Sequence, residues 1–287
     1  MKQKIKLNLG ASPIWHRKGW HILDHKLKKN HKNSISGDMA KINLKNKSCD
    51  NVFCSHVFEH IPHIKLPECI AEINRVMIKG GILRILTPDL EKVCNAYTNR
   101  DKKFFKKAFE EDENIRRDLG FGGYLMNFIV SPGQDTVLIN RNLNQFISGY
   151  AHLYSYDYKM LSKILAVAGF KTRKATFNDS KIKEMQEPLH VIGLEKKWQN
   201  FNKKFYKKNK LTHIYKNGKY EINFKVTGFD RDPVTSLIIE AKKIKDVSKM
   251  KIINVFNNST KNYNRYAFSL LKNKNFNKEL LKRNIKI

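Results

Sequence analysis

The sequence has few cysteines, few acidic residues and no long apolar run. Its four cysteines (Cys49, Cys54, Cys69 and Cys94) form no CxxC pair, which argues against a zinc ribbon and a disulfide scaffold. No stretch reaches the roughly 18 uninterrupted apolar residues of a membrane-spanning helix. The opening residues MKQKIKLNLG lack the apolar segment of about 7–15 residues found in a secretory signal. These absences predict a reduced, soluble, cytoplasmic protein without a transmembrane segment.

The chain is long and apolar enough to build a substantial core. Its 287 residues suffice for one large domain, or for one domain with a cap and a tail. Hydrophobic residues make up 41% of the chain, which excludes wholesale disorder.

The charge is strongly positive, with 56 Lys and Arg against 26 Asp and Glu and a net charge of +30. The chain holds 45 Lys but also 29 Asn, and both residues have A-rich codons. Selection for a polyanion partner would not raise Asn as well, so the pattern favours an AT-rich genome as its origin. The excess is largest in residues 201–287, with 22 basic and 6 acidic residues. Any nucleic-acid contact, or a weak contact with an anionic surface, would lie there.

The first hundred residues alternate between short apolar strands and helices. Apolar residues recur at helical spacing from Leu66 to Met77, and Lys79-Gly80-Gly81 would end that helix. This alternation implies a parallel sheet with right-handed crossovers, so we expect a doubly wound α/β fold. The strands predicted here are Ile5–Leu9, Trp20–Leu23, Asn51–Ser55 and Ile82–Leu86.

Later segments predict the remaining elements of the sheet. Leu161–Ala168 forms a helix face that ends at Gly169, a natural residue after a helix C-terminus. Strands are expected at Phe170–Phe177 and Val234–Ala241. Asn217-Gly218 lies between two apolar stretches, which is a strong β-hairpin signal.

Five segments carry a resemblance to a known family. They are LNLGAS (Leu7–Ser12), GWHILD (Gly19–Asp24), GDMAKI (Gly37–Ile42), SHVFEHI (Ser55–Ile61) and RVMIKGGILRILTPDLE (Arg75–Glu91). In this order and spacing they resemble class I S-adenosylmethionine-dependent methyltransferases, within a type 11-like group that has H-V-x-E-H after the fourth strand. Segments Gly149–Phe170 and Ser236–Lys243 resemble later parts of the same group.

The resemblance implies a mostly parallel seven-stranded sheet, S-adenosylmethionine as cofactor and S-adenosylhomocysteine as product. We expect residues 1–94 to form the Rossmann-like cofactor-binding half and 95–150 an inserted cap over the acceptor site. Residues 151–245 would complete the sheet, with an inserted basic hairpin region at 196–228. Residues 246–287 would form a basic Lys/Asn-rich tail.

The cofactor site is predicted at the ends of the first strands. Gly10 permits close backbone approach at the first strand-to-helix turn, although the family usually has two or three glycines there. Asp24 ends the second strand and suits the ribose hydroxyls. Asp38 with Met39 resembles the pair at the adenine ring; otherwise both carboxylates would be strand-end or capping groups. The expected cofactor-binding residues are Leu9, Gly10, Ala11, Asp24, Asp38, Met39, Ser55 and His56.

Methyl transfer needs mainly positioning and exclusion of water, because the sulfonium is already activated. A general base is required only for an acceptor that starts protonated. His56 and His152 are the predicted catalytic residues, since histidine has an unperturbed pKa of about 6.5. A cluster of Glu59 with His60 and His63 in one loop does not by itself predict a metal, and no metal site is expected. The expected substrate-binding residues are Glu59, His60, Asp89 and Tyr154.

The leading hypothesis is methyl transfer to a small molecule or a cell-envelope sugar that enters between the sheet edge and the cap. One alternative is an RNA or DNA methyltransferase that uses the basic last third, but SHVFEH replaces the expected Asn/Asp-Pro-Pro-Tyr/Phe segment. The basic aromatic stretch around Trp198 could stack bases, or form an amphipathic helix. Two further alternatives are a noncatalytic cofactor-binding protein and transfer of the cofactor's aminocarboxypropyl group.

Overall fold

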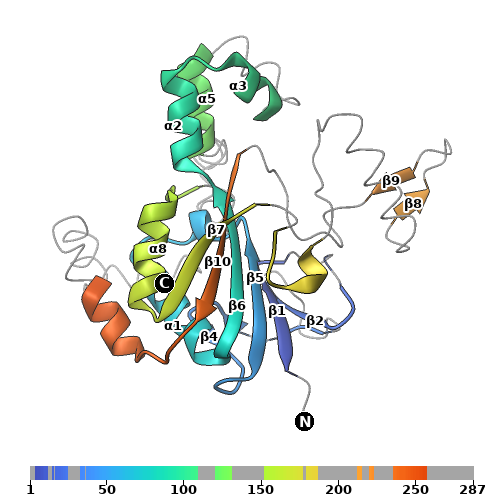
Figure 1. Cartoon of the computed structure of the whole chain (residues 1–287), viewed down its shortest axis with the longest axis vertical. Helices are drawn as coiled ribbons and strands as arrows, with labels where there is room; N and C mark the ends of the chain where they lie inside the picture. Colours follow the sequence, from blue (N-terminus) through green and yellow to red (C-terminus); the bar gives the residue numbers. More distant parts are fainter. Residues whose placement is uncertain are drawn as a thin grey trace, which may run out of the picture.

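A computed structural model describes residues 4–11, 15, 17–24, 33–35, 37–108, 120–130, 152–176, 179–186, 212–214, 220–222 and 235–256. Its centre is a six-stranded sheet of order β2-β1-β5-β6-β10-β7 (Figure 1). Strands β2, β1, β5 and β6 are mutually parallel, whereas β10 is antiparallel to both of its neighbours. The strands are β1 (Ile5–Leu9), β2 (Trp20–Leu23), β5 (Cys49–Ser55), β6 (Met77–Pro88), β7 (Phe170–Ala175) and β10 (Ser236–Lys243).

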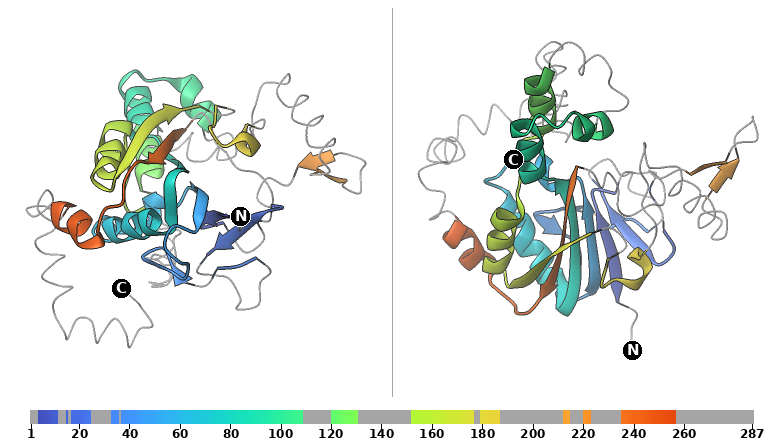
Figure 2. Two further views of the ribbon diagram at one scale, coloured as in Figure 1. Left: turned by 60° about the horizontal axis from the view of Figure 1, so that its bottom comes forward. Right: turned by 45° about the horizontal axis from the view of Figure 1, so that its top comes forward.

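Helices α1 and α8 pack on the same face of this sheet (Figure 2). Their apolar residues join those of the strands in one buried cluster, which also contains Ile252 of a helical segment at 249–256. The helix face predicted around Leu66 is confirmed, as is the one that ends at Gly169, where φ is +84°. The helices are α1 (Leu66–Val76), α2 (Leu90–Thr98), α3 (Lys102–Ala108), α5 (Gly120–Ile129), α8 (Tyr158–Val167) and the 3-10 turns η1 (Phe58–His60) and η2 (Lys183–Met185).

The second face of the sheet holds a separate apolar cluster that includes Trp15, Trp20 and Phe53. Strand alternation separates the faces: Phe53 lies in this cluster, while its neighbours Val52 and Cys54 lie in the other. The sheet therefore buries apolar residues on both faces, with α1 and α8 covering one of them, and this architecture confirms the predicted α/β class.

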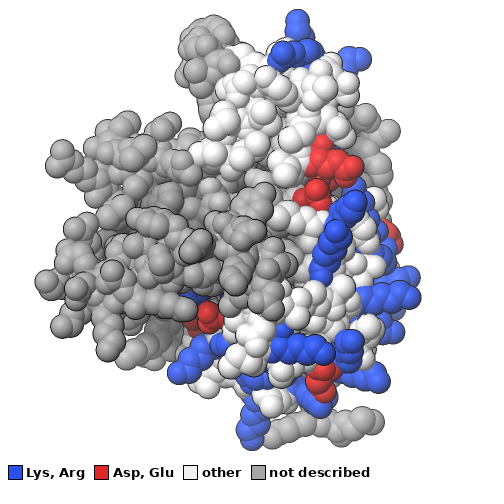
Figure 3. Space-filling model, turned by 90° about the vertical axis from the view of Figure 1, so that its left-hand side faces the viewer, with Lys and Arg blue, Asp and Glu red and all other residues white. Residues whose placement is uncertain are grey.

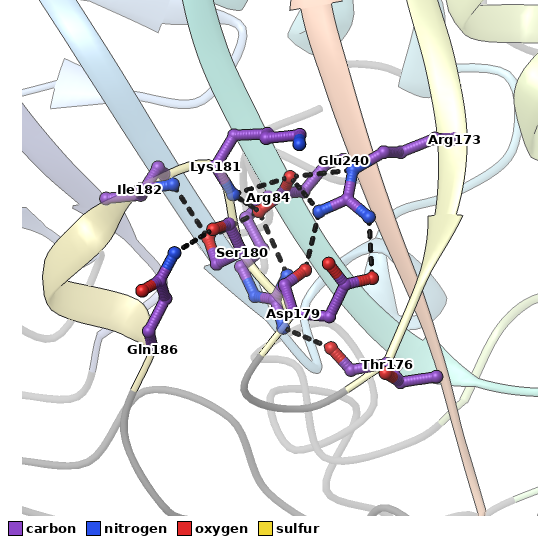
Figure 4. A network of polar contacts seen from close by, with 9 residues as sticks. All are labelled: Arg84, Arg173, Thr176, Asp179, Ser180, Lys181, Ile182, Gln186 and Glu240. Atoms are coloured by element: carbon purple, nitrogen blue, oxygen red, sulfur yellow. Dashed lines mark hydrogen bonds and ion pairs between the residues drawn. The ribbon is translucent and has the colours of Figure 1, made fainter.

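A buried ionic network also lies on the second face (Figure 4). Arg84 of β6, Glu240 of β10 and Arg173 of β7 are direct cross-strand partners. Arg84 donates to Glu240 at 3.1 Å and Arg173 donates to it at 2.8 Å. Ser180 and the Lys181 backbone also donate to the Glu240 carboxylate, which ties the segment at 179–186 to three strands.

The predicted seven-stranded sheet is corrected to six strands in the described part of the chain. The residues at the expected third-strand position, beside β2, make only an isolated parallel bridge between Ser34 and Ile22. The chain then turns into a short hairpin of β3 (Gly37–Asp38) and β4 (Lys41–Ile42). Gly37, the first residue of this hairpin, has a φ of +130°, which a residue with a side chain rarely adopts.

The position of the Gly-Gly stop is also corrected. Helix α1 ends at Val76, and β6 begins immediately at Met77 rather than after Gly81. Pairing explains the longer strand, because Met77 is already in register with Cys49 of β5. Hydrogen bonds between the strands therefore outweigh the tendency of Gly80 and Gly81 to interrupt a strand.

Helices α2, α3 and α5 lie beyond the end of the sheet at which β6 terminates (Figure 1). A third apolar cluster joins them and includes Phe105, Tyr124 and Phe128. A cap over the acceptor site at 95–150 stays a prediction, and residues 109–119 and 131–151 lie outside the described part.

The predicted hairpin around Asn217-Gly218 is confirmed in its strands, whereas the two turn residues lie outside the described residues. Strands β8 (Thr212–Ile214) and β9 (Tyr220–Ile222) pair antiparallel. The stretch around Trp198 and the residues after 256 also lie outside the description.

No helix of the described residues is long and apolar enough to cross a membrane. On the face seen in Figure 3, Lys and Arg side chains are dispersed among acidic and uncharged ones. This distribution does not add support for a polyanion partner, and the nucleic-acid alternative stays a prediction about the last third of the chain.

Candidate functional site

The residues predicted from the motifs meet at one edge of the sheet. Since β1, β2, β5 and β6 are parallel, their carboxyl ends lie at the same edge. Gly10, Asp24, His56 and Asp89 directly follow these four strands. Strand β10 runs the other way, so its first residue, Ser236, also lies at this edge.

Gly10 forms the predicted tight turn. Its φ is +68°, and its N–H donates to the carbonyl oxygen of Leu23 at 2.7 Å. A Cβ at this position would lie 2.4 Å from Cγ2 of Val57, closer than real Cβ atoms approach. Both the conformation and the space therefore require glycine.

The other predicted cofactor-binding residues differ in how far their side chains are buried. The Leu9 side chain is fully buried in the core, so only its backbone is left for a ligand. Asp38 is exposed, and its Oδ1 accepts from the Ala40 N–H at 2.7 Å, while Met39 is largely buried. Ala11 is buried, and the predicted turn residue Ser12 lies outside the described residues.

His56 is held in a strained backbone conformation at the end of β5. Its φ is +52°, which is uncommon for a residue with a side chain and costs roughly 1–2 kcal/mol. Its N–H donates to the Leu86 carbonyl oxygen at 2.8 Å. Nδ1 of the ring lies 3.1 Å from Oε1 of Glu59, and Nε2 lies 3.0 Å from Oγ of Ser236. Such strain is typical of functional positions.

Glu59 is a buried carboxylate with only 1% of its side chain exposed. Burial alone raises its pKa, but the neighbouring His56, His60 and His152 outweigh burial and lower the pKa below its ordinary value. Thr87 donates to Oε2 at 3.1 Å. The carboxylate is therefore ionised, and it faces three imidazoles.

His152 reaches the same place from a distant part of the chain. The N–H groups of Leu153 and Tyr154 donate to the Glu59 carbonyl oxygen at 2.7 and 3.2 Å. Nδ1 of His152 donates to the Phe128 carbonyl oxygen of α5 at 2.9 Å. Burial lowers the pKa of His152, which keeps the ring neutral. The rings of His152 and His60 lie 5.0 Å apart, edge to face.

The remaining predicted substrate residues have structural partners. Asp89 is fully buried and caps helix α2, accepting from the N–H of Glu91 at 3.1 Å and that of Lys92 at 3.4 Å. Tyr154 stacks on His63 with ring centroids 4.0 Å apart. Their contact with an acceptor stays a prediction.

Sequence reasoning did not find Ser236, Thr87 or the Phe128 carbonyl group. Thr87 and Ser236 lie in segments that carry the resemblance, but nothing in those segments marks either side chain as a site residue, and a backbone oxygen leaves no sequence signal. Only the pairing of β10 with β6 brings Ser236 to His56.

The chain was also compared with known proteins. Residues 21–85 match a family model described as a methyltransferase domain. No curated protein sequence matches the chain.

Similar solved structures include a SAM-dependent methyltransferase from Archaeoglobus fulgidus, at 15% identity and a TM-score of 0.38 over 84% of this chain and 87% of that one. Another is an S-adenosylmethionine-dependent methyltransferase from Mesorhizobium loti, at 12% identity and a TM-score of 0.39 over 83% and 90%. A third is phosphoethanolamine N-methyltransferase 2 of Haemonchus contortus in complex with S-adenosyl-L-methionine, at 12% identity and a TM-score of 0.34 over 85% and 50%.

The strand order and the family match together confirm the predicted resemblance. The sheet is like that of class I S-adenosylmethionine-dependent methyltransferases, with the antiparallel strand β10 between β6 and β7. The same observations support S-adenosylmethionine as the cofactor.

The residues at the sheet edge fit this cofactor. The Gly10 turn presents backbone without a side chain, since Val57 fills the space that a Cβ would take, and Asp24 stands at the end of the neighbouring strand. Oγ of Ser55 is buried and has no hydrogen-bond partner among the described residues, so it is available to a bound molecule.

Replacing Asp24 with Ala is expected to weaken S-adenosylmethionine binding about 10- to 150-fold. The reason is the loss of charge-assisted hydrogen bonds worth about 1.5–3 kcal/mol. Calorimetric titration measures the affinity, and circular dichroism checks that the fold is intact. An unchanged affinity in the folded variant contradicts the ribose role of Asp24.

Proposed function

We propose that this protein transfers the methyl group of S-adenosylmethionine to a hydroxyl of a small molecule or cell-envelope sugar. The observation that carries the proposal is the meeting, at one sheet edge, of the Gly10 turn with His56, whose Nδ1 lies 3.1 Å from the Glu59 carboxylate. The acceptor would lie between this edge and the cap helices α2, α3 and α5. The preference for a sugar rests only on the resemblance, because methyltransferases of this group often accompany proteins that act on cell-envelope sugars.

Four residues are proposed to hold the cofactor. The Gly10 backbone would approach it closely, and Asp24 would accept hydrogen bonds from the ribose hydroxyls. Asp38 and Met39 would contact the adenine ring. When bound, the cofactor supplies a methyl group already activated on a sulfonium, so the protein's task is to position the acceptor and exclude water.

His56 is proposed as the base that removes the acceptor's proton. Oε1 of Glu59 lies 3.1 Å from Nδ1, where the carboxylate would stabilise the positive charge that forms when Nε2 takes a proton. In this role the acceptor hydroxyl replaces Ser236 as the partner of Nε2. His152 is the second candidate, because its bond to Phe128 leaves Nε2 with a lone pair.

Incubation of the full chain with methyl-labelled S-adenosylmethionine and a panel of hydroxyl-bearing acceptors tests this function. The expected result is label in an acceptor and release of S-adenosylhomocysteine in equal amount. Methylthioadenosine as product would instead indicate aminocarboxypropyl transfer. Failure to label any hydroxyl acceptor, together with label entering RNA or DNA, would contradict the proposed acceptor class.

A further inference from the structure

Three potential metal ligands converge beside the predicted acceptor site. One ligand atom from each of Glu59, His60 and His152 lies within 4.8 Å of the other two. We call these residues the Glu59 cluster. The sequence grouped Glu59 and His60 with His63, but His63 instead stacks on Tyr154. The third member, His152, comes from more than ninety residues further along the chain.

The backbone holds the cluster together without help from its side chains. Glu59 and His60 share the single turn η1, and the Glu59 carbonyl oxygen accepts from two N–H groups directly after His152. The segment after His152 is also bridged to the end of β6 through Asp89 and Tyr156. The three side chains are therefore brought to one place by the fold itself.

His152 is oriented as a metal ligand would be. A carbonyl oxygen can only accept, so the contact with Phe128 places the proton on Nδ1 and leaves the lone pair on Nε2. Metal-bound histidines commonly donate their other ring nitrogen to a backbone carbonyl or a carboxylate in this way. This bond lies outside the cluster and is an independent sign of a ligand.

The Glu59 carboxylate is also placed as a metal ligand would be. It is buried, and the Thr87 hydroxyl donates to its Oε2 at 3.1 Å. Oε1 lies 3.1 Å from His56 but accepts no well-aligned hydrogen bond from the described residues. A buried carboxylate beside imidazoles gains from a cation that it can share with them.

We propose that the Glu59 cluster binds a divalent transition-metal ion of the zinc type, with Glu59, His60 and His152 as its protein ligands. Two imidazoles and one carboxylate suit such ions, whereas magnesium prefers oxygen ligands. Zinc holds these ligands at about 2.0–2.2 Å, so binding draws the three atoms together by at most about 1.5 Å. Three protein ligands leave a coordination position open, as in catalytic sites.

This inference deepens the proposed function and rests on it for the metal's role. The open position would take the acceptor hydroxyl, and the metal would make that hydroxyl easier to deprotonate. The hydroxyl proton would pass to His56, the oxygen would form a bond to the methyl carbon, and the carbon–sulfur bond would break to release S-adenosylhomocysteine. With His152 as a metal ligand, His56 would be the base that removes the proton.

Calorimetric titration of the tag-free, chelator-treated full chain with Zn²⁺ alone tests the site. One ion per chain is expected, and Co²⁺ in its place should give visible absorption from a site with fewer than six ligands. His152→Ala and His60→Ala should each lower the Zn²⁺ affinity by more than about tenfold. His63→Ala is the matched control, since it removes a neighbouring histidine outside the cluster and should leave the affinity unchanged.

The outcomes separate the metal site from the proposed function. Equal Zn²⁺ affinity in the wild type and in both folded cluster variants overturns the site, as does the absence of binding by the wild type. If the His152 variant does not fold, the His60 variant and the Co²⁺ spectrum decide. Zn²⁺ binding without S-adenosylmethionine binding would support the site and contradict the function, and the reverse result would do the opposite.

Discussion

Replacing His56 with Asn is expected to slow methyl transfer by about 10²–10⁴-fold, with little change in affinity for S-adenosylmethionine. Asn tolerates the left-handed backbone conformation at this position and keeps the main chain of the site, but it cannot accept the acceptor's proton. Single-turnover rates with labelled cofactor measure the chemical step, and calorimetry measures the affinity.

Ser236→Ala is the matched control for this variant. It removes the present partner of Nε2 while leaving the imidazole and Glu59 in place. Since the acceptor would displace Ser236 in any case, the rate should fall by less than about tenfold. Wild-type rates in folded His56→Asn protein would remove His56 from the mechanism.

Replacing Glu240 with Ala is expected to lower the free energy of unfolding by about 3–5 kcal/mol. The change leaves the fully buried guanidinium of Arg84 without its carboxylate and frees the donors of Arg173, Ser180 and Lys181. Urea denaturation followed by circular dichroism measures the loss.

Two further variants test whether the buried, unpaired charge causes the loss of stability in Glu240→Ala. Asp179→Ala removes the exposed partner of Arg173 and should cost no more than about 1 kcal/mol. The double variant Arg84→Met, Glu240→Leu removes the buried charge together with its partner, so it should be more stable than Glu240→Ala. Equal losses for Asp179→Ala and Glu240→Ala would show that burial does not decide the cost.

Local pattern was sufficient to predict the central elements. Ile5–Leu9 and Trp20–Leu23 are strands with the predicted bounds, and Gly10 takes the left-handed conformation that its turn required. These features depend on neighbours in the chain: short apolar runs bounded by turn residues. The end of each strand then indicated where polar side chains would gather.

What the sequence did not predict depends on pairing between distant segments. Strand β6 starts before its glycines because Met77 pairs with β5, and the third strand is reduced to one bridge at Ser34. Neither outcome is encoded in local propensity, since tertiary hydrogen bonds override it.

The candidate site shows the same division. His56, Glu59 and His60 lie in one motif and were predicted together from it. The grouping of Glu59 with His152, and of His56 with Ser236, depends on segments that are far apart in the chain. The sequence predicted that His152 would join these residues at the sheet edge, but it considered a metal cluster only with His63 of the same loop, and from that cluster no metal site was expected.

The central claim is that this sheet edge binds S-adenosylmethionine. Calorimetric titration of the folded full chain with S-adenosylmethionine, and separately with S-adenosylhomocysteine, tests it most directly. We predict one site per chain and dissociation constants of about 1–100 micromolar, roughly −8 to −5.5 kcal/mol. No binding of either molecule by folded protein would contradict the account and would mean that the single-glycine turn at Gly10 no longer holds the cofactor.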